Sequence, residues 1–365
     1  MNLSIGIVGL PNVGKSTLFN ALLKKQQALV ANYPFATIEP NVGVVAVPDE
    51  RLLKLAEITK EDEKMNDLPP IKPATVNFVD IAGLVKGASE GAGLGNKFLS
   101  HIREVSVIAH VVRAFEDGNI LREGSVGVKE DYETINTELA LSDIQSLQKV
   151  LENRKLEPDK KSGAEKLLNG LNNGQRAYDV LLSDKEKEAT YDLFLLTNKP
   201  EIIVLNVSEQ EYNPETIEKV LNDYSEKLGV SKEKLVVISA KIEAELASLS
   251  DEEQKEYLKD LGLSASGLER LIQKAYQELG LISFLTCGAK EVKAWTIKKG
   301  MNAQNASGEI HTDFIKHFIR AEIVGYSDFV ENNGWKGSRE KGKARLEGKE
   351  YIVNDGDVVE FKIGN

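Results

Sequence analysis

SIGIVGLPNVGKSTLFNALL, residues 4–23, is the stretch that decides the fold of this chain. An apolar strand leads into the spacing G-x-x-x-x-G-K-S and then into an apolar-periodic helix, which is the order of a phosphate-binding P-loop. The glycines let the backbone wrap around phosphate oxygens, so that successive N–H groups and the helix N-terminus face the negative charge. The motif predicts a nucleoside triphosphate site with contacts from Asn12, Val13, Gly14, Lys15, Ser16 and Thr17.

Three side chains of this motif have distinct expected roles. Lys15 is expected to bridge the β- and γ-phosphates and is the first candidate catalytic residue. Ser16 is expected to present its hydroxyl to Mg²⁺, and Thr17 to contact the α-phosphate from the start of the helix. The P-loop therefore predicts both a nucleotide site and a metal site.

Two later segments complete the expected metal site. Thr37, in the proline-marked loop that precedes the next strand, is the candidate second Mg²⁺ ligand. Asp80 ends an apolar strand and opens a D-x-x-G motif, so we expect it to hold a Mg²⁺-bound water. The N–H of Gly83, the second candidate catalytic group, is expected to sense the γ-phosphate.

The stretch after this motif bears on hydrolysis. Residues 84–96 contain four glycines, which predicts a mobile segment rather than the start of a helix. Leu84 stands where small switch GTPases carry a water-orienting Gln, and leucine cannot hydrogen-bond a water. We expect slow intrinsic hydrolysis, or a water that is oriented by the backbone, another side chain or a monovalent cation. Asn12 is the candidate ligand of such a cation, and K⁺ is the candidate ion.

Two segments compete for the role of the base-reading N-K-x-D element. Residues 198–201 (NKPE) match it more closely but precede a strand, whereas ligands of open α/β sheets lie beyond the carboxyl ends of strands. Asn206, Val207 and Glu209 follow that strand, so we assign N-x-x-E as the base motif. The usual Asp accepts from guanine N1–H and the 2-amino group, which adenine lacks, so this motif favours adenine. A second strand ends in Ser239, Ala240 and Lys241, which are expected to border the base.

Composition limits the classes of function. The 365 residues predict more than one domain, and no stretch approaches the length of apolar chain that spans a membrane. The N-terminus runs directly into the nucleotide motif, and the single cysteine fits a reducing compartment, so we expect a cytoplasmic protein.

A net charge of -11 argues against a protein whose whole surface binds nucleic acid, and no DNA binding is expected. The four histidines show no zinc spacing and are interpreted as structural.

Two further modules are expected besides the nucleotide-binding domain. Apolar stripes at Ile144, Leu147 and Leu151, and from Leu167 to Leu182, predict two antiparallel helices in an insertion at about 125–197, either a solvated hairpin or a docking arm. From residue 281 onward, strand-like segments and a helix near Thr312 predict a β-grasp domain at 281–365. Residues 336–349 carry six basic and two acidic residues beside Trp335, a modest RNA-binding composition. The nucleotide-binding domain is assigned to 1–280.

Taken together, GLPNVGKSTLFNAL, NYPFATIEPN, DIAGLVKGAS, NVSE, SAKIEAE and the C-terminal motifs from IHTDF to NDGDVVEF resemble the YchF family of Obg-related ATPases over the whole chain. The resemblance implies an Obg-like α/β P-loop NTPase G-domain, an inserted helical coiled-coil arm and a ubiquitin-like TGS domain. It also implies ATP hydrolysis and association with the ribosome, with the large subunit expected, or with RNA through the arm and the TGS domain. Its Mg²⁺ ligands fall on Ser16 and Thr37.

The chain departs from the family pattern at one position. Many relatives carry a histidine proposed to help catalysis two residues after the Asn-Ile that is here Asn119-Ile120, and this chain has Arg122 there. Arginine stays protonated and is not a base, so Arg122 is interpreted either as stabilising phosphate charge or as having no role. Three functions remain open: a slow ATPase that controls a ribosome or RNA contact, a GTPase of the same fold, and a nucleotide-sensing scaffold with negligible hydrolysis.

Overall fold

The computed structural model describes residues 3–32, 41–81, 93–115, 127–153 and 155–364. The chain forms two units, and each of them contains two separate segments. Unit 1 comprises Met1–Val45 and Asn77–Ala275, and unit 2 comprises Ala46–Val76 and Tyr276–Asn365. In the part of the chain that the structure describes, no helix is long and apolar enough to cross a membrane.

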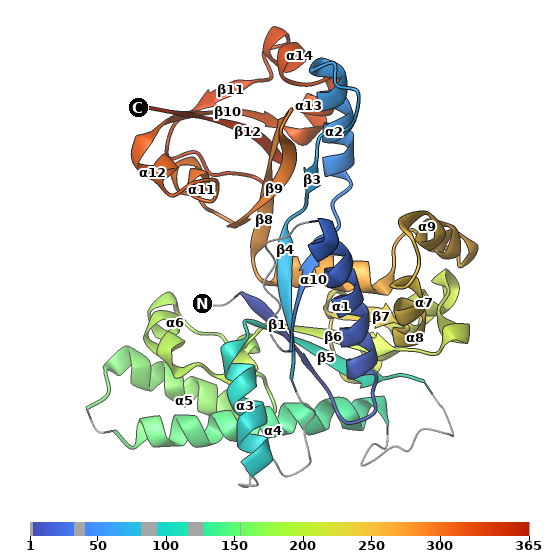
Figure 1. Cartoon of the computed structure of the whole chain (residues 1–365). Helices are drawn as coiled ribbons and strands as arrows, with labels where there is room; N and C mark the ends of the chain where they lie inside the picture. Colours follow the sequence, from blue (N-terminus) through green and yellow to red (C-terminus); the bar gives the residue numbers. More distant parts are fainter. Residues whose placement is uncertain (1–2, 33–40, 82–92, 116–126, 154, 365) are drawn as a thin grey trace. The chain divides into compact units, whose positions relative to one another are not determined.

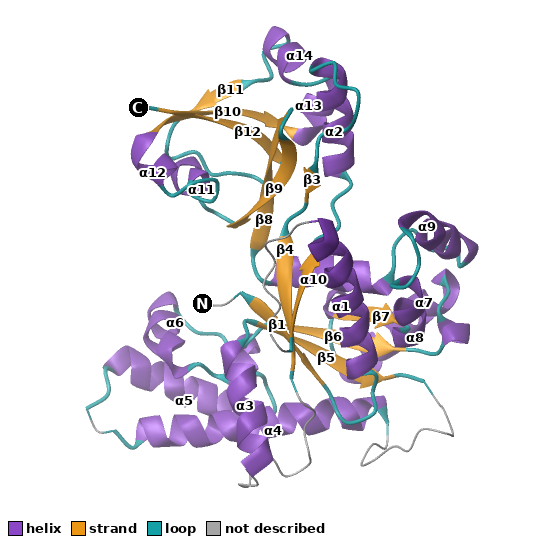
Figure 2. Cartoon of the chain, in the orientation of Figure 1, coloured by secondary structure: helices purple, strands orange, loops and turns teal. Residues whose placement is uncertain are grey.

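Unit 1 is built on a six-stranded sheet in the order β2-β4-β1-β5-β6-β7 (Figures 1 and 2). The strands are β1 Ser4–Val8, β2 Val42–Ala46, β4 Thr75–Asp80, β5 Val107–Arg113, β6 Glu201–Asn206 and β7 Leu235–Ile238. The pairs from β4 through β1, β5 and β6 to β7 are parallel. Every residue of β1, β5, β6 and β7 is buried, as expected for parallel strands that are covered on both faces. Their carboxyl ends therefore meet at one edge of the sheet.

Helices pack around this sheet, and loops connect them to its strands (Figure 1). They are α1 Lys15–Asn32, α3 Gly93–Glu104, α7 Pro214–Leu228, α8 Ala240–Leu246, α9 Asp251–Asp260 and α10 Gly267–Glu278. α1 begins one residue after the second P-loop glycine, as predicted. α3 begins at Gly93, so the expectation that residues 84–96 do not start a helix is wrong for 93–96. Residues 84–92 of that segment lie outside the described residues.

The insertion between β5 and β6 is helical. It contains α4 Val128–Leu151, α5 Pro158–Asn172 and α6 Asp184–Thr190. Leu147 of α4 packs in a buried cluster with Leu167 and Leu171 of α5, which confirms the predicted apolar contact between two helices. The second helix was predicted too long, because α5 ends at Asn172, before Gly174, which has a positive φ of 79°. Tyr178 and Leu181 consequently lie outside the helix and are exposed.

A buried polar cluster joins this insertion to the sheet. Glu201, the first residue of β6, lies 2.9 Å from a guanidinium nitrogen of Arg176 and 3.1 Å from Nδ1 of His110. The hydroxyl of Tyr132 on α4 donates to Glu201 at 3.1 Å. Burial opposes ionisation of Glu201, but the charge of Arg176 and the bonds from His110 and Tyr132 outweigh it and lower its pKa to about 2. His110 thus has a structural partner inside the unit.

Unit 2 is a second six-stranded sheet in the order β11-β10-β12-β8-β9-β3. Its strands are β3 Ile71–Lys72, β8 Leu281–Gly288, β9 Glu291–Lys298, β10 Phe318–Gly325, β11 Arg345–Glu347 and β12 Asp357–Ile363. Its helices are α2 Arg51–Asp62, α11 Ala303–Ser307, α12 Asp313–His317, α13 Tyr326–Glu331 and α14 Trp335–Glu340. The helix predicted near Thr312 is short, because α12 ends at His317 and Phe318 begins β10.

The segment 46–76 belongs to unit 2, although the sequence analysis placed it in the nucleotide-binding domain. β3 pairs with β9 in parallel, with Ile71 opposite Val292. α2 carries Leu52, Leu55 and Ile58 as a buried stripe on an otherwise charged helix. An amphipathic helix of this kind is stable only when its apolar face is covered, and α2 contacts β8 and β9. Thus residues from an early part of the chain complete the C-terminal sheet.

Candidate nucleotide site

The loop between β1 and α1 adopts the backbone that a phosphate cradle requires. Gly9 and Gly14 have φ values of 159° and 102°, and Asn12 has a φ of 62°, which asparagine tolerates better than most residues. A Cβ atom on Gly14 would lie 2.3 Å from Nδ2 of Asn206, so this position has no room for a side chain. The side chain of Val13 is buried and anchors the loop in the protein interior. The turn is therefore fixed by both conformation and close packing.

Lys15 lies at the start of α1 with its ammonium group directed back into the loop. Its Nζ donates to the carbonyl oxygen of Leu10 at 2.6 Å, which holds the side chain across the cradle. Burial lowers the pKa of Lys15 to about 8, and the negative charge of Asp80 opposes this shift. A cation whose charge is poorly solvated is prepared to gain free energy from an incoming triphosphate.

Asp80 ends β4 beside the P-loop strand, where its partner in the register is Ile7 of β1. Burial raises the pKa of its carboxyl group, and the charge of Lys15 lowers it. Asp80 is half-buried at the end of β4, and carboxylate oxygens are ligands that Mg²⁺ prefers. Three predicted site residues, Thr37, Gly83 and Arg122, lie outside the described residues, as does Leu84.

Asn206 connects the P-loop to the base-reading side of the pocket. It is buried at the end of β6, its Nδ2 donates to the carbonyl oxygen of Val13 at 2.9 Å, and its Oδ1 accepts from the backbone N–H of Ala240 at 2.9 Å. One side chain therefore holds together the loops after β1, β6 and β7. The competing segment 198–201 lies before β6, as the sequence analysis argued.

Glu209 and Lys241, which both line the pocket formed by these loops, make an ion pair. The Lys241 Nζ lies 2.7 Å from Oε2 of Glu209, and the two side chains are 70% and 40% exposed, respectively. The hydrogen bond to Glu209 raises the pKa of Lys241. The carboxylate that stands in the place of the guanine-reading Asp is thus already paired with a cation of the neighbouring loop.

These elements enclose a pocket of about 740 Å³, a size typical of small-ligand sites. Of the predicted nucleotide contacts in the P-loop and the two base loops, all except the buried Val13 line it. The structure adds two lining residues that the sequence analysis did not name, Phe115 and Ser208. The predicted residues are therefore brought together at the carboxyl edge of the sheet.

Phe115 is the more informative of these additions. It follows β5, and the guanidinium carbon of Arg113 lies 4.5 Å from the centre of its ring while Nε of Arg113 donates to its carbonyl oxygen. An aromatic ring in a purine-sized pocket offers a stacking surface for a base. Its position immediately after a buried strand, at the same edge as Asn206, was the sequence signal that could have identified it.

Ser239 and Glu243 support the base side from beneath. Ser239 is buried and lines the pocket, and within the described residues its hydroxyl has no hydrogen-bond partner. Glu243 accepts through Oε1 from the Tyr212 hydroxyl at 3.0 Å and from the Gly267 N–H at 2.7 Å, and burial raises its pKa. The first turn of α8 is thereby held against α10, which steadies the loop that borders the base.

Buried parallel strands that lead into a glycine loop, with Lys15 at the start of the following helix, define a P-loop nucleoside triphosphatase domain. Residues 4–156 match a family model described as a 50S ribosome-binding GTPase, and residues 281–364 match YchF-GTPase_C, described as a protein of unknown function. The chain belongs to the YchF family.

Relatives cover the chain from end to end. It is 47% identical to a ribosome-binding ATPase YchF of Bacillus subtilis (strain 168) and 46% identical to that of Escherichia coli O157:H7, with 99% of each chain aligned. The structure of the Schizosaccharomyces pombe YchF GTPase superposes with a TM-score of 0.84 at 38% identity, covering 99% of this chain and 98% of that one. The similarity therefore includes the C-terminal unit as well as the nucleotide-binding one.

Proposed function

We propose that this chain is a Mg²⁺-dependent ATPase that binds the ribosome and hydrolyses ATP slowly. Its curated relatives are named ribosome-binding ATPases at 46–47% identity over the full length. The observation that carries the choice of base is the ion pair between Lys241 and Glu209. Guanine recognition needs a carboxylate that accepts two N–H groups, and here one of the two oxygens of Glu209 is paired with Lys241. Adenine has neither the N1–H nor the 2-amino group, so it needs no carboxylate at this position, and it is the base that the pocket favours.

We expect the base to be held mainly by apolar side chains and by the backbone of the loops that line the pocket. Val207 is buried against the pocket, and Phe115 provides an aromatic wall. The backbone at Ser239 and Ala240 is close enough to border the ring, because Asn206 fixes the Ala240 N–H. These contacts favour a flat purine in general, so discrimination against guanine comes from the missing acceptor rather than from a clash.

The metal and the phosphates are assigned to residues of the P-loop and β4. We assign the Mg²⁺ ligands to Ser16 and Thr37, with Asp80 acting through a bound water, because a hydroxyl and a half-buried carboxylate stand on adjacent elements. Bound Mg²⁺ would neutralise charge on the β- and γ-phosphates. Lys15 holds those phosphates, and the Gly83 N–H and Arg122 are the further groups assigned to the γ-phosphate.

Slow turnover follows from the residue that succeeds the D-x-x-G motif. Leu84 cannot orient a water, so the attack must be aided by the backbone, by Arg122 or by a K⁺ ion. Asn12 lines the pocket and has a positive φ, and we assign it as the candidate K⁺ ligand. Multiple-turnover phosphate release with and without K⁺ and ribosomes tests this assignment, since a scaffold would show no release under any condition.

Calorimetric titration with ATP and GTP in the presence of Mg²⁺ tests the base assignment. We expect ATP to bind at least about tenfold more tightly, which corresponds to about 1.4 kcal/mol. The variant Glu209→Asp with Lys241→Ala, which frees a shorter carboxylate, should narrow that ratio. Equal affinity of the unchanged protein for the two nucleotides would instead identify a GTPase of the same fold.

A further inference from the structure

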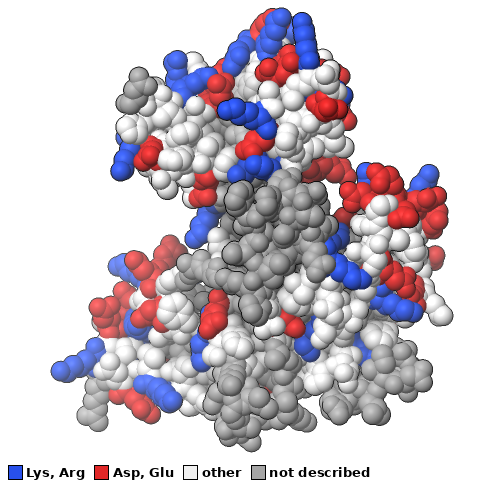
Figure 3. Space-filling model, viewed as in Figure 1, with Lys and Arg blue, Asp and Glu red and all other residues white. Residues whose placement is uncertain are grey.

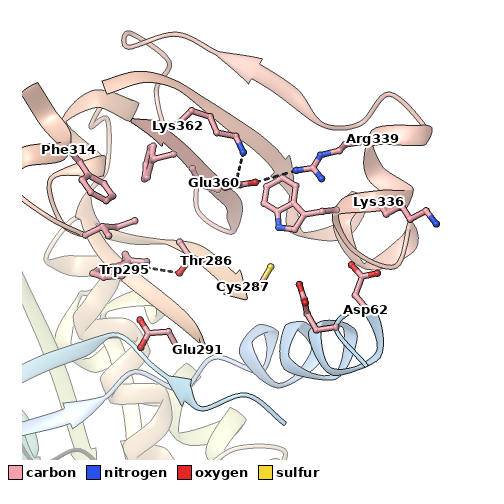
Figure 4. Close-up of a pocket in the computed structure, with 15 residues that line it drawn as sticks. Asp62, Thr286, Cys287, Glu291, Trp295, Phe314, Lys336, Arg339, Glu360 and Lys362 are labelled. Atoms are coloured by element: carbon pink, nitrogen blue, oxygen red, sulfur yellow. Dashed lines mark hydrogen bonds and ion pairs between the residues drawn. The ribbon is translucent and has the colours of Figure 1, made fainter. Parts of the chain in front are cut away.

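A second pocket, of about 800 Å³, is formed entirely by residues of unit 2. It lies over β8, β9 and β12 and is bounded by α12 on one side and by the ends of α2 and α14 on the other (Figure 4). This volume exceeds the space that a single ion or one side chain occupies, and it falls within the range of ligand sites. None of its lining residues belongs to the nucleotide site.

The walls of this groove are aromatic at both ends. Trp295 of β9 stacks on Phe284 at 6.2 Å, and its Nε1 donates to Oγ1 of Thr286 at 2.9 Å, so the ring is held in place. Phe314 lies beside Trp295, away from Asp62 and Lys336 (Figure 4). Trp335, the first residue of α14, packs edge-on against Phe329 at 5.3 Å. Two fixed indole rings therefore provide stacking surfaces.

Both of these rings already accept cations from the protein itself. The Nζ of Lys293 lies 3.3 Å from the centre of the Trp295 ring, and the guanidinium carbon of Arg339 lies 5.4 Å from that of Trp335. Cation–π attraction is strongest for tryptophan and grows when the pair is partly removed from water. The groove thus has the electronic character of a site for an organic cation.

The basic side chains of the groove are largely neutralised. Arg339 makes two hydrogen bonds to Glu322, at 2.7 and 2.9 Å, and reaches Glu360 at 3.3 Å. Lys362 pairs with the same Glu360 at 2.5 Å. Figure 3 shows Lys and Arg side chains interspersed with Asp and Glu on the visible face of this unit, rather than a basic surface. A phosphate-rich ligand would find few cations available.

Two carboxylates of the groove remain available. Asp62 and Glu63, at the end of α2, are exposed, and within the described part of the chain neither makes an ion pair or a side-chain hydrogen bond. Lys336 also lines this end of the groove; among the described residues its ammonium has no ion-pair partner, and in Figure 4 it points away from Asp62. Burial raises the pKa of Cys287 to about 12, with the charges of Asp62 and Glu360 adding to the shift, so the thiol on the floor is neutral. The excess charge at this end is negative.

We propose that the groove binds a segment of a partner polypeptide through one arginine side chain and one apolar side chain. The guanidinium would lie against Trp335 and between the carboxylates of Asp62 and Glu63. A planar, weakly hydrated cation stacks on an indole and pairs with carboxylates at the same time, which an ammonium does less well. The apolar side chain would lie at the other end of the groove, against Phe314 and Trp295. A free polyamine has no apolar side chain that could make this second contact.

The chain contains two tryptophans, and both line the groove, so tryptophan fluorescence reports on this site without a label. The probe is a capped Leu-Gly-Gly-Arg peptide, titrated into the full-length protein beside the same peptide with citrulline in place of arginine. We expect a saturable fluorescence change with the arginine peptide and at least about tenfold weaker binding of the citrulline peptide, which lacks the charge.

The double variant Asp62→Asn/Glu63→Gln should weaken binding of the arginine peptide by about tenfold or more. The matched control Glu57→Gln/Glu61→Gln removes two exposed carboxylates of the same helix that do not line the groove, and it should bind as the unchanged protein does. ATP affinity should be the same in all three proteins, which separates this site from the proposed nucleotide function. Equal binding of the citrulline peptide, or equal binding by the Asp62→Asn/Glu63→Gln protein, overturns the proposal. So does a response to spermidine or to oligouridine without one to the arginine peptide.

Discussion

The side-chain amide of Asn206 donates a hydrogen bond of 2.9 Å to the main-chain oxygen of Val13, across 193 residues of sequence. This contact places the base loop in a fixed position relative to the phosphate loop, so that base and phosphates are read at one spacing. The same side chain accepts from Ala240, and both of its polar ends are therefore engaged inside the protein. Asn206 therefore fixes the shape of the pocket, in addition to its proposed contact with the base.

Substitution of Asn206 by alanine should weaken ATP and GTP to the same degree, because it loosens three loops rather than one base contact. Two buried polar groups would lose their partner, at about 1–3 kcal/mol each. Calorimetry on both nucleotides and urea unfolding without nucleotide measure the two effects. Loss of ATP affinity alone, with unchanged stability, would show that Asn206 contacts only the base.

Phe115→Ala should reduce ATP affinity by about tenfold, since stacking of a base on an aromatic ring contributes about 1–3 kcal/mol. Phe115→Tyr should bind nearly as the parent does, because the aromatic ring that stacks on the base is kept. The comparison is made by equilibrium titration with a fluorescent ATP analogue. An alanine variant that binds like the tyrosine variant would mean that the ring borders the pocket without covering the base.

ATP affinity should decline as the pH rises above about 8, because the pKa of Lys15 is lowered to about that value. Below it the ammonium is charged and attracts the triphosphate; above it the free protein must take up a proton as it binds. Calorimetry in buffers of different ionisation enthalpy measures that uptake directly. Lys15→Arg removes the titration, since arginine stays charged, and should give no proton uptake in this range.

The lowered pKa of Lys15 also has a consequence for folding. Because the folded protein binds this proton less tightly than the unfolded chain, whose lysine titrates near 10.5, stability should increase as the pH rises from about 8 toward 10.5. The Lys15→Arg variant lacks this contribution. Unfolding curves of the two proteins over that pH range should therefore diverge, and parallel curves would show that the ammonium is well solvated.

Glu201→Gln should destabilise unit 1 by about 3–5 kcal/mol, because it leaves the buried guanidinium of Arg176 without its counter-charge. The pKa of Glu201 is lowered to about 2 from 4.5, so its ionised form stabilises the fold above about 4.5 and that contribution is lost as the pH falls toward 2. Urea unfolding at a series of acidic pH values tests both points. The double variant Glu201→Gln/Arg176→Met should recover part of the loss, whereas additive effects would show that the two residues do not depend on each other.

The phosphate loop and the order of the base motifs could be predicted because their signals are local. Gly9, Gly14 and Lys15 act through their own backbone and their immediate neighbours, and the position of Asn206 after a strand excluded the segment at 198–201. Eleven of the expected nucleotide contacts line one pocket as a result. Their roles toward ATP and Mg²⁺ stay predictions.

Other features depend on contacts between distant segments and were missed. Phe115 has a local signal in its position after β5, but the loops that line the same pocket are needed to show that its ring borders a ligand site. α5 stops at Asn172 because Gly174 turns the chain, although the apolar period continues to Leu182. No local pattern in 46–76 shows that β3 pairs with β9 more than two hundred residues later, since two adjacent pairing residues carry almost no sequence signal.

The assignment of α2 and β3 to the C-terminal sheet has a consequence during synthesis. A nascent chain exposes Leu52, Leu55 and Ile58 early, and the strands β8 and β9 that cover them are made only after all of unit 1. Unit 2 therefore cannot close until those strands have been synthesised, and its early segment stays uncovered until then. A protein truncated before Tyr276 would keep that apolar stripe permanently bare, which makes aggregation of such fragments the expected outcome.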